Sequence, residues 1–276
     1  MSWFQQWVSE SYSIRQLALQ KGISSAKLRR VKDYFLKQDP EGIWQSHPLS
    51  SIEYIQVDGT YFHKDGCLFL VIAGESQKVI GSRYVPQEDY ESSHALFKEL
   101  KERGLMPVYA ALDGHRQVRQ ALEAVWPEIK IQRCLYHIQR EGMRWLRTYP
   151  KTQAGKELRV LLRGLCGIKS KREREEFKLA YAMWKQNYWD FVKSLPASNI
   201  GWKDLKKTIS LLDRAMPEMF QYLEDERLDA TTNKLESIFS RLKADYRRHR
   251  GLTQSNKIQY LKWYCYFHNL KISNTL

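Results

Sequence analysis

Two aspartates in the sequence each end or interrupt an apolar run and are each followed by glycine. They are Asp58, in VDGT, and Asp113, in LDGH. A carboxylate at the end of a strand is held by a rigid element and faces the edge where ligands bind. If the two strands are neighbours, the carboxylates meet, and two close anions require a shared proton or a cation between them. Ligands that are all oxygen favour a hard ion such as Mg²⁺ or Mn²⁺.

The same Asp-Gly pairs have a simpler interpretation. Asp-Gly is typical of turns, and each pair taken alone fits a turn better than a ligand. Both aspartates follow apolar runs with strand character, however, and this repetition favours the metal-binding hypothesis for Asp58 and Asp113.

A third carboxylate, Glu236, lies in a segment with helical periodicity. The apolar positions of that segment are Leu235, Ile238, Phe239, Leu242 and Tyr246. Glu236 flanks this stripe in the first turn. Asn233 as the N-cap with Glu236 three residues later also resembles a capping box, and the spacing supports this alternative equally well. The two roles conflict only in part, because the helix dipole keeps such a carboxylate ionised and able to bind metal.

The elements that must position these carboxylates follow from residue periodicity. Apolar or alternating runs predict strands at residues 52–62, 67–73, 79–85, 108–112 and 129–133. Helices are expected between the third and fourth strands, capped by Ser92 or Ser93, and between the fourth and fifth. The predicted order is therefore β-β-β-α-β-α-β, in an α/β protein with a mixed five-stranded sheet flanked by helices. Residues 1–40, 141–225 and 226–276 have helical patterns.

Composition indicates the kind of partner. The 276 residues carry a net charge of +14 and are 43% hydrophobic, so a packed core and a polyanionic partner are both expected. Nucleic acid is the usual partner of such a chain, and an anionic membrane surface is the competitor. The longest apolar run, residues 67–73, is too short to span a membrane. The first twenty residues lack the apolar core of a signal peptide, which predicts a cytoplasmic location.

The four cysteines are widely scattered and form no C-x-x-C pair. This spacing argues against a disulfide framework and against a zinc ribbon, so reduced thiols are expected.

Residues 14–31 have the pattern of a helix-turn-helix. Gly22 stands at the turn, Ser24 or Ser25 caps the second helix, and Leu28 and Val31 are its apolar positions. The basic residues expected near the exposed face of that second helix are Lys27, Arg29, Arg30 and Lys32. They suit a DNA major groove and its phosphates; a plain helical hairpin is the alternative.

The ordered set Asp58, Asp113, the C-x-x-H motif of Cys134 and His137, and Glu236 resembles bacterial insertion-sequence transposases of the Mutator-like group. Flanking text is similar as well, with TTN before the glutamate and RHRGL after it. The resemblance covers roughly residues 50–270. It implies an RNase H-like core in residues 50–140 and 226–276, with an all-α insertion in residues 141–225.

The resemblance also implies a mechanism. Two Mg²⁺ or Mn²⁺ ions would clamp the attacking and leaving oxygens of a phosphodiester displacement. Water frees a 3′-OH at the transposon end, and that hydroxyl attacks target DNA. Asp58 is expected to bridge both metals, with Asp113 and Glu236 each holding one.

Other residues receive accessory roles. Cys134 and His137 could share a helix face, but structural zinc needs four ligands and only two are visible. No signature of a Cys-His nucleophile accompanies them, so a structural or DNA-positioning role beside the site is expected. His115 could approach the scissile phosphate, and a surface histidine is an equal alternative. Phosphate contacts are predicted for the basic residues after the glutamate, which are Arg241, Lys243, Arg247, Arg248 and Arg250; a solvated charged face is the alternative.

The partners expected from the resemblance are double-stranded DNA, as terminal inverted repeats and target, and a second copy of the chain in a homodimer at the nucleoid. Three alternatives remain. The chain could be an RNase H-like nuclease that does not join strands, or a domesticated DNA-binding protein without catalysis. It could also be an unrelated basic helical protein.

Overall fold

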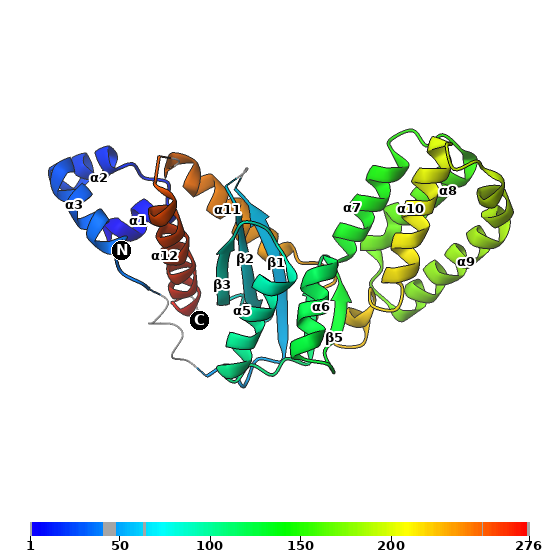
Figure 1. The fold of residues 1–276 in the computed structure, drawn as a ribbon, viewed down its shortest axis with the longest axis horizontal. Coiled ribbons are helices and arrows are strands. Elements are labelled where there is room, and N and C mark those ends of the chain that lie inside the picture. Colours follow the sequence, from blue (N-terminus) through cyan, green and yellow to red (C-terminus); the bar gives the residue numbers. More distant parts are fainter. Residues whose placement is uncertain (1, 41–47, 63–64, 250, 275–276) are drawn as a thin grey trace. The chain divides into compact units, whose positions relative to one another are not determined.

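The computed structural model describes residues 2–40, 48–62, 65–249 and 251–274 (Figure 1). The fold is mixed α/β, and its five strands form one sheet in the order β3-β2-β1-β4-β5. The chain divides into two compact units. Unit 1 comprises Met1–Val108, Arg116–Ile129 and Asn233–Leu276, and unit 2 comprises Tyr109–His115 and Lys130–Thr232. The α/β class and the mixed five-stranded sheet expected from the sequence are thus confirmed.

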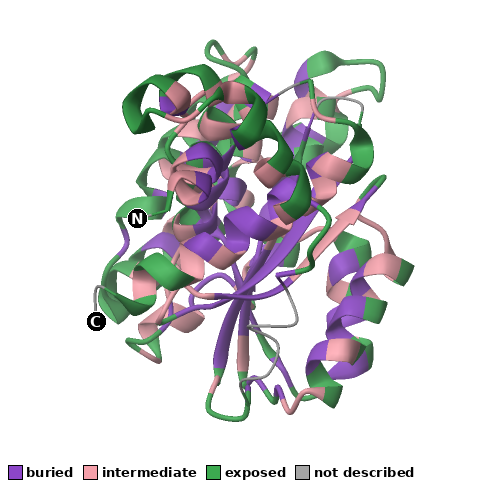
Figure 2. Ribbon diagram, turned by 90° about the vertical axis from the view of Figure 1, so that its left-hand side faces the viewer, coloured by how far each residue is buried: buried purple, intermediate pink, exposed green. Residues whose placement is uncertain are grey.

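Unit 1 contains three antiparallel strands, β1 (Tyr54–Tyr61), β2 (Cys67–Ala73) and β3 (Val79–Val85). Every residue of β2 is buried, as a continuous apolar run predicts for a central strand (Figure 2). The sequence predicted β2 and β3 with these bounds. Strand β1 begins two residues later and ends one residue earlier than the predicted range of residues 52–62.

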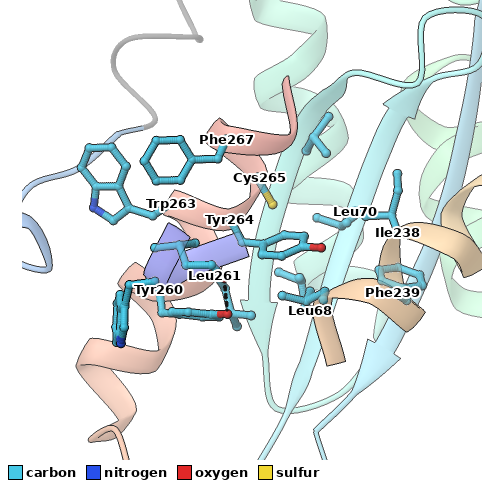
Figure 3. Close-up of a cluster of buried hydrophobic side chains, with 14 of the residues drawn as sticks. Leu68, Leu70, Ile238, Phe239, Tyr260, Leu261, Trp263, Tyr264, Cys265 and Phe267 are labelled. Carbon is cyan, nitrogen blue, oxygen red and sulfur yellow. Dashed lines mark hydrogen bonds between the residues drawn. The ribbon is translucent and has the colours of Figure 1, made fainter. Parts of the chain in front are cut away.

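Helices cover both faces of these strands. Side chains alternate across a strand, so Leu68, Leu70 and Ile72 of β2 share one face. On that face they pack with α11 (Asn233–Tyr246) and α12 (Gln254–Ser273), as Figure 3 shows for Leu68 and Leu70. On the other face the ring of Phe69 lies 5.9 Å from the ring of Phe97 in α5. Helix α5 (Tyr90–Glu102) packs in turn on α6 (Arg116–Val125).

The start of α5 corrects one prediction. Its N-cap is Asp89, not Ser92 or Ser93, and the Asp89 carboxylate accepts the backbone N–H of Ser92 at 2.8 Å. Aspartate caps a helix as well as serine does, and the helix therefore begins earlier than the serines suggested. Ser93 is instead buried inside the helix, at 1% exposure.

Three short helices precede the strands: α1 (Trp3–Ser9), α2 (Ile14–Lys21) and α3 (Ser25–Phe35). The two helices predicted between residues 14 and 31 are formed as α2 and α3. Gly22 ends α2 with a φ of 63°, a left-handed conformation that favours glycine. The hydroxyl of Ser24, the first of the two proposed caps, accepts the backbone N–H of Lys27.

These N-terminal helices share a core with the C-terminal ones. The hydroxyl of Tyr260 in α12 donates to the carbonyl of Val8 at 2.6 Å. The indole N–H of Trp263 donates to the carbonyl of Phe35 at 2.9 Å. The rings of Phe4 and Trp263 also meet edge to face at 5.3 Å. Segments at the two ends of unit 1 are therefore packed as one body.

Unit 2 combines two parallel strands, β4 (Tyr109–Leu112) and β5 (Lys130–Arg133), with a helical part. Its α-helices are α7 (Leu135–Leu146), α8 (Gln153–Gly164), α9 (Lys171–Ser194) and α10 (Ile200–Ala215). They bury a separate apolar cluster, and the fully buried leucines Leu158, Leu162 and Leu212 belong to it. Short 3₁₀ turns lie at Leu165–Gly167 and Gln221–Leu223 in this unit, and at Arg247–His249 in unit 1.

A helix that crosses a bilayer must be both long and apolar. Within the described ranges, no helix combines enough length with enough apolar character to cross one.

Candidate active site

Asp58 lies inside strand β1, and the pairing register decides which way it points. Asp58 pairs with Leu70 of β2, and residues directly opposite each other in an antiparallel pair project to the same face. Leu70 packs against α11 and α12, so the half-buried Asp58 carboxylate belongs to that helix-covered face. The strand continues through Gly59, which pairs with Phe69. The turn interpretation of this Asp-Gly pair is therefore wrong.

Glu236 is carried by α11. The helix is fixed by its buried stripe of Leu235, Ile238, Phe239 and Leu242, as the sequence predicted. Glu236 is half-buried beside this stripe. One carboxylate oxygen of Glu236 and one of Asp58 lie within 4.8 Å of each other. Two carboxylates far apart in the chain are thus brought together within unit 1.

The start of α11 bears on the capping alternative for Glu236. The helix begins at Asn233, which is its first helical residue and not the residue before it. A capping box joins the N-cap to the residue three positions later, and with this start Glu236 lies one position too far along. The structure therefore does not reproduce the proposed capping box.

The Asp58 and Glu236 pair suits a hard cation. Mg²⁺ holds oxygen ligands at about 2.0–2.1 Å, so two oxygens on one ion are separated by up to about 4.2 Å. The two carboxylates each offer an oxygen within 4.8 Å of the other, so both could be ligands of one ion. Their donor atoms are oxygens, which Mg²⁺ and Mn²⁺ prefer.

Asp113 belongs to unit 2 and directly follows strand β4. Its Oδ1 accepts the backbone N–H of His115 at 2.8 Å, and Gly114 between them has a φ of 95°. The Asp-Gly pair here forms a turn, as the alternative interpretation proposed. The turn holds the half-buried carboxylate at the strand end. His115 is half-buried too, and its Nδ1 has no hydrogen-bond partner among the described residues.

Gly114 is required at this turn for a second reason. A Cβ at this position would lie 2.0 Å from the guanidinium carbon of Arg133. Arg133 is 8% exposed and donates from Nη2 to the Asp113 carbonyl at 3.2 Å. The guanidinium thus packs over the glycine and fixes the backbone of the turn. Arg133 carries no local signal of this role in the sequence.

Gly114→Ala is expected to destabilise the chain by about 2 kcal/mol, because alanine is strained at positive φ and its methyl group must displace Arg133. Urea unfolding of the variant measures this loss. Gly164→Ala is the matched control, since Gly164 ends helix α8 with open space around its Cβ position. Equal midpoints for Gly114→Ala and wild type would contradict the role given to Gly114.

Cys134 connects two segments of unit 2. Its backbone N–H donates to the carbonyl of Leu112, the residue before Asp113, at 3.0 Å. Its sulfur accepts the backbone N–H of Thr232 at 3.3 Å and the Thr232 hydroxyl at 3.4 Å. Thr232 is the residue before α11, which carries Glu236. Cys134 therefore ties the end of β4 to the segment that leads into the glutamate helix.

His137 contributes to the same cluster. Burial alone would raise the pKa of the Cys134 thiol, but hydrogen bonds from His137 and Thr232 outweigh it and leave this pKa lowered. A thiol that receives several hydrogen bonds is held in one orientation. The positioning role expected for Cys134 and His137 stays a prediction, and the contacts add Thr232, a residue not singled out in the sequence, to this cluster. The TTN motif before Glu236, which contains Thr232, was the sequence signal that could have identified this residue.

The predicted DNA-contacting residues lie at two places in unit 1. Lys27, Arg29 and Arg30 of α3 are exposed. Lys32 differs, because its side chain pairs with Asp33 at 2.9 Å and lies over the Trp7 ring. Exposed basic residues near the end of α11 and in the turn after it are Arg241, Lys243, Arg247 and Arg248. Arg250 lies outside the described residues.

Comparison with known proteins adds an independent finding. Residues 70–256 match the family model described as transposase, Mutator family. The matched segment includes Asp113, Cys134 and Glu236 but begins after Asp58. A transposase for insertion sequence element ISRM3 of Rhizobium meliloti is 23% identical over 215 residues, covering 73% of this chain and 50% of the relative. A probable ISRM3-like transposase of Sinorhizobium fredii is 22% identical over 215 residues, which again cover 73% of this chain and 50% of the relative. The chain thus spans about half the length of these relatives.

Proposed function

Because the chain belongs to the Mutator family of transposases, we propose that it cleaves DNA at transposon ends and joins the freed ends to target DNA. The observation that carries the proposal is the approach of the Asp58 and Glu236 carboxylates within 4.8 Å on one face of β1. Side chains of this kind are suited to a divalent cation and to phosphodiester chemistry. The names of the two relatives agree with this proposal.

In the proposed site, Asp58, Asp113 and Glu236 would hold two Mg²⁺ or Mn²⁺ ions. Asp58 would contribute to both ion positions, and Asp113 and Glu236 would contribute to one each. When bound, the ions would stabilise negative charge on the attacking and leaving oxygens of an in-line displacement. The chain's own contribution is to fix these carboxylates. A strand and a packed helix hold Asp58 and Glu236, and a glycine turn under Arg133 holds Asp113.

The chemistry then runs in two displacements. In the first, a water oxygen attacks the phosphorus, the bond from phosphorus to O3′ breaks, and a 3′-OH is released. In the second, that 3′-OH attacks a phosphorus of target DNA and displaces another 3′-oxygen. Neither step forms a covalent bond to the protein, so no serine, tyrosine or cysteine nucleophile is required. His115 and the Cys134 and His137 pair are proposed to position DNA and the carboxylates.

The proposed partner is double-stranded DNA, and the proposed place of action is the nucleoid. Two transposon ends must be brought together, and a two-fold homodimer on DNA is the simplest assembly that does so.

The test is strand cleavage and joining on a labelled transposon-end duplex with Mg²⁺ or Mn²⁺. We expect a metal-dependent 3′-OH and a joined product from the wild type. Both should be lost in Asp58→Ala, Asp113→Ala and Glu236→Ala while DNA binding persists. Asp190→Ala, at an exposed position of α9, is the matched control and should remain active.

Two other results would point to the alternatives. Cleavage without joining would identify a nuclease. Tight binding of the correct end with no chemistry in either metal would identify a DNA-binding protein that has lost catalysis.

A further inference from the structure

The exposed basic residues of unit 1 lie in chain segments that are far apart in the sequence. One group is Lys27, Arg29 and Arg30 on α3. The other is Arg247 and Arg248 in the 3₁₀ turn that directly follows α11. Their separation in the chain suggests two independent DNA contacts. The packing around His249 instead shows that both segments are attached to the same helix, α1.

His249 is the third residue of that 3₁₀ turn and is 6% exposed. Its Nε2 lies 2.9 Å from the carbonyl oxygen of Trp7 in α1, and the two rings lie 4.5 Å apart. The His249 ring also lies 5.2 Å from the ring of Tyr260, whose hydroxyl bonds the Val8 carbonyl. The turn that carries Arg247 and Arg248 is therefore packed directly on α1.

The second contact runs from α1 to α3. The ammonium group of Lys32 lies 5.8 Å from the centre of the Trp7 ring, on the same indole that packs on His249. The rings of Phe4 in α1 and Phe35 at the end of α3 stack at 4.5 Å. Lys32 and Arg248 are both close enough to His249 to disfavour its protonated form. One basic residue of α3, Lys32, and one of the turn, Arg248, thus both lie near the buried His249.

A further hydrogen bond fixes the link after α1. The hydroxyl of Ser11 donates to Asp245, near the end of α11, at 2.5 Å. Ser11 has a φ of 57°, a conformation that costs a non-glycine residue free energy and persists only where its surroundings hold it. The chain entering α2 is therefore attached to the same helix end that carries Arg247 and Arg248.

We infer that α3 and the Arg247–His249 turn form one surface that binds the backbone of a single DNA duplex within one protomer. The partner is double-stranded DNA contacted through its phosphates by Lys27, Arg29, Arg30, Arg247 and Arg248. Because α11 leads from Glu236 into this turn, the position of α3 on the duplex sets which phosphodiester lies nearest Glu236. This inference rests on the proposed function for the identity of the partner.

The test uses the full chain and a short labelled duplex, without divalent metal, so that binding is measured apart from chemistry. Fluorescence anisotropy gives affinity against salt concentration, and a titration well above the dissociation constant gives the number of duplexes bound per chain. The variants are Arg29→Ala/Arg30→Ala, Arg247→Ala/Arg248→Ala, and all four together. Lys98→Ala/Lys207→Ala removes the same charge from exposed positions elsewhere and is the matched control.

One surface predicts at most one duplex per chain. Each phosphate contact contributes about 0.9 to the slope of log affinity against log salt concentration. We therefore expect each arginine pair to reduce the slope by about 1.8, both pairs together by about 3.6, and the control pair to leave it unchanged.

Two results would overturn the inference while leaving the proposed function intact. One is two duplexes per chain in the wild type, with each double variant keeping one site of unchanged affinity. The other is a slope that falls for only one of the two arginine pairs. A chain that binds no duplex under any salt condition would instead remove the DNA-acting function itself, so the two failures can be told apart.

Discussion

The proposed metal site predicts that Mn²⁺ raises the melting temperature of the wild-type chain, and that Asp58→Asn and Glu236→Gln each remove this stabilisation. Each change keeps the size of the side chain and removes one negative charge from the carboxylate pair. Loss of groups that only support a metal ligand costs about 10–100-fold in affinity, so loss of a ligand should cost about 100-fold or more. At 100 times its dissociation constant an ion stabilises a protein by about 2.7 kcal/mol. For a chain of this length that raises the melting temperature by roughly 5 °C.

The measurement is thermal unfolding of each variant over a series of Mn²⁺ concentrations. Asp190→Asn is the control, because Asp190 is an exposed aspartate of α9. It should show the full wild-type shift. A wild-type melting temperature that does not respond to Mn²⁺, or a Glu236→Gln variant that responds fully, would contradict the metal site within unit 1.

Lowering the pH from 6.5 towards 4 is expected to destabilise unit 1 by about 3 kcal/mol through His249. Burial lowers the pKa of His249 to about 4, while the hydrogen bond to the Trp7 carbonyl acts in the opposite direction. The positive charges of Lys32 and Arg248 also lower this pKa, and the rings of Trp7 and Tyr260 pack on the His249 ring. Between these pH values the unfolded chain takes up a proton that folded His249 does not. The contribution of His249 to the free energy of unfolding is therefore fully present above pH 6.5 and is lost as the pH falls to about 4.

This contribution can be isolated by difference. His268 also has a lowered pKa, caused first by burial, so the wild type alone would report both histidines. His249→Gln retains a side-chain N–H that can donate to the Trp7 carbonyl but does not titrate. Urea unfolding of wild type and His249→Gln should give a difference that shifts in favour of the variant as the pH falls. His94→Gln is the control, and a pH-independent difference for His249→Gln would contradict the assignment.

Local patterns predicted the strands well. The apolar run of β2 and the alternation of β1 placed both elements because these patterns follow directly from the burial of one or both faces of a strand. The cap of α5 was misplaced because Asp89 and two nearby serines compete for the same role, and only the backbone path decides between them. Docking of α1 on α12 was not predicted, because Trp7 and Tyr260 carry no local sign of their partner.

The candidate site divides in the same way. The cation site at Asp58, Asp113 and Glu236 was proposed from residue type and position alone, and the metal itself stays a prediction. The distance between Asp58 and Glu236 could not be predicted from the sequence, because it depends on how α11 packs on Leu70 and its neighbours. The bonds of Thr232 to the Cys134 sulfur were also hidden, because threonine before a helix looks like an ordinary cap.

The face of β2 that carries Leu68 and Leu70 is covered by helices that come much later in the chain. The ribosome adds about 5–20 residues per second, so roughly 8–30 s pass between synthesis of β3 and arrival of Leu235. During that interval the nascent strands present a bare apolar surface to solvent. A polypeptide terminated before α11 would keep that surface exposed and would be prone to aggregate. Holdase chaperones are therefore expected to engage this protein during translation, and premature termination should yield insoluble fragments, not partly functional ones.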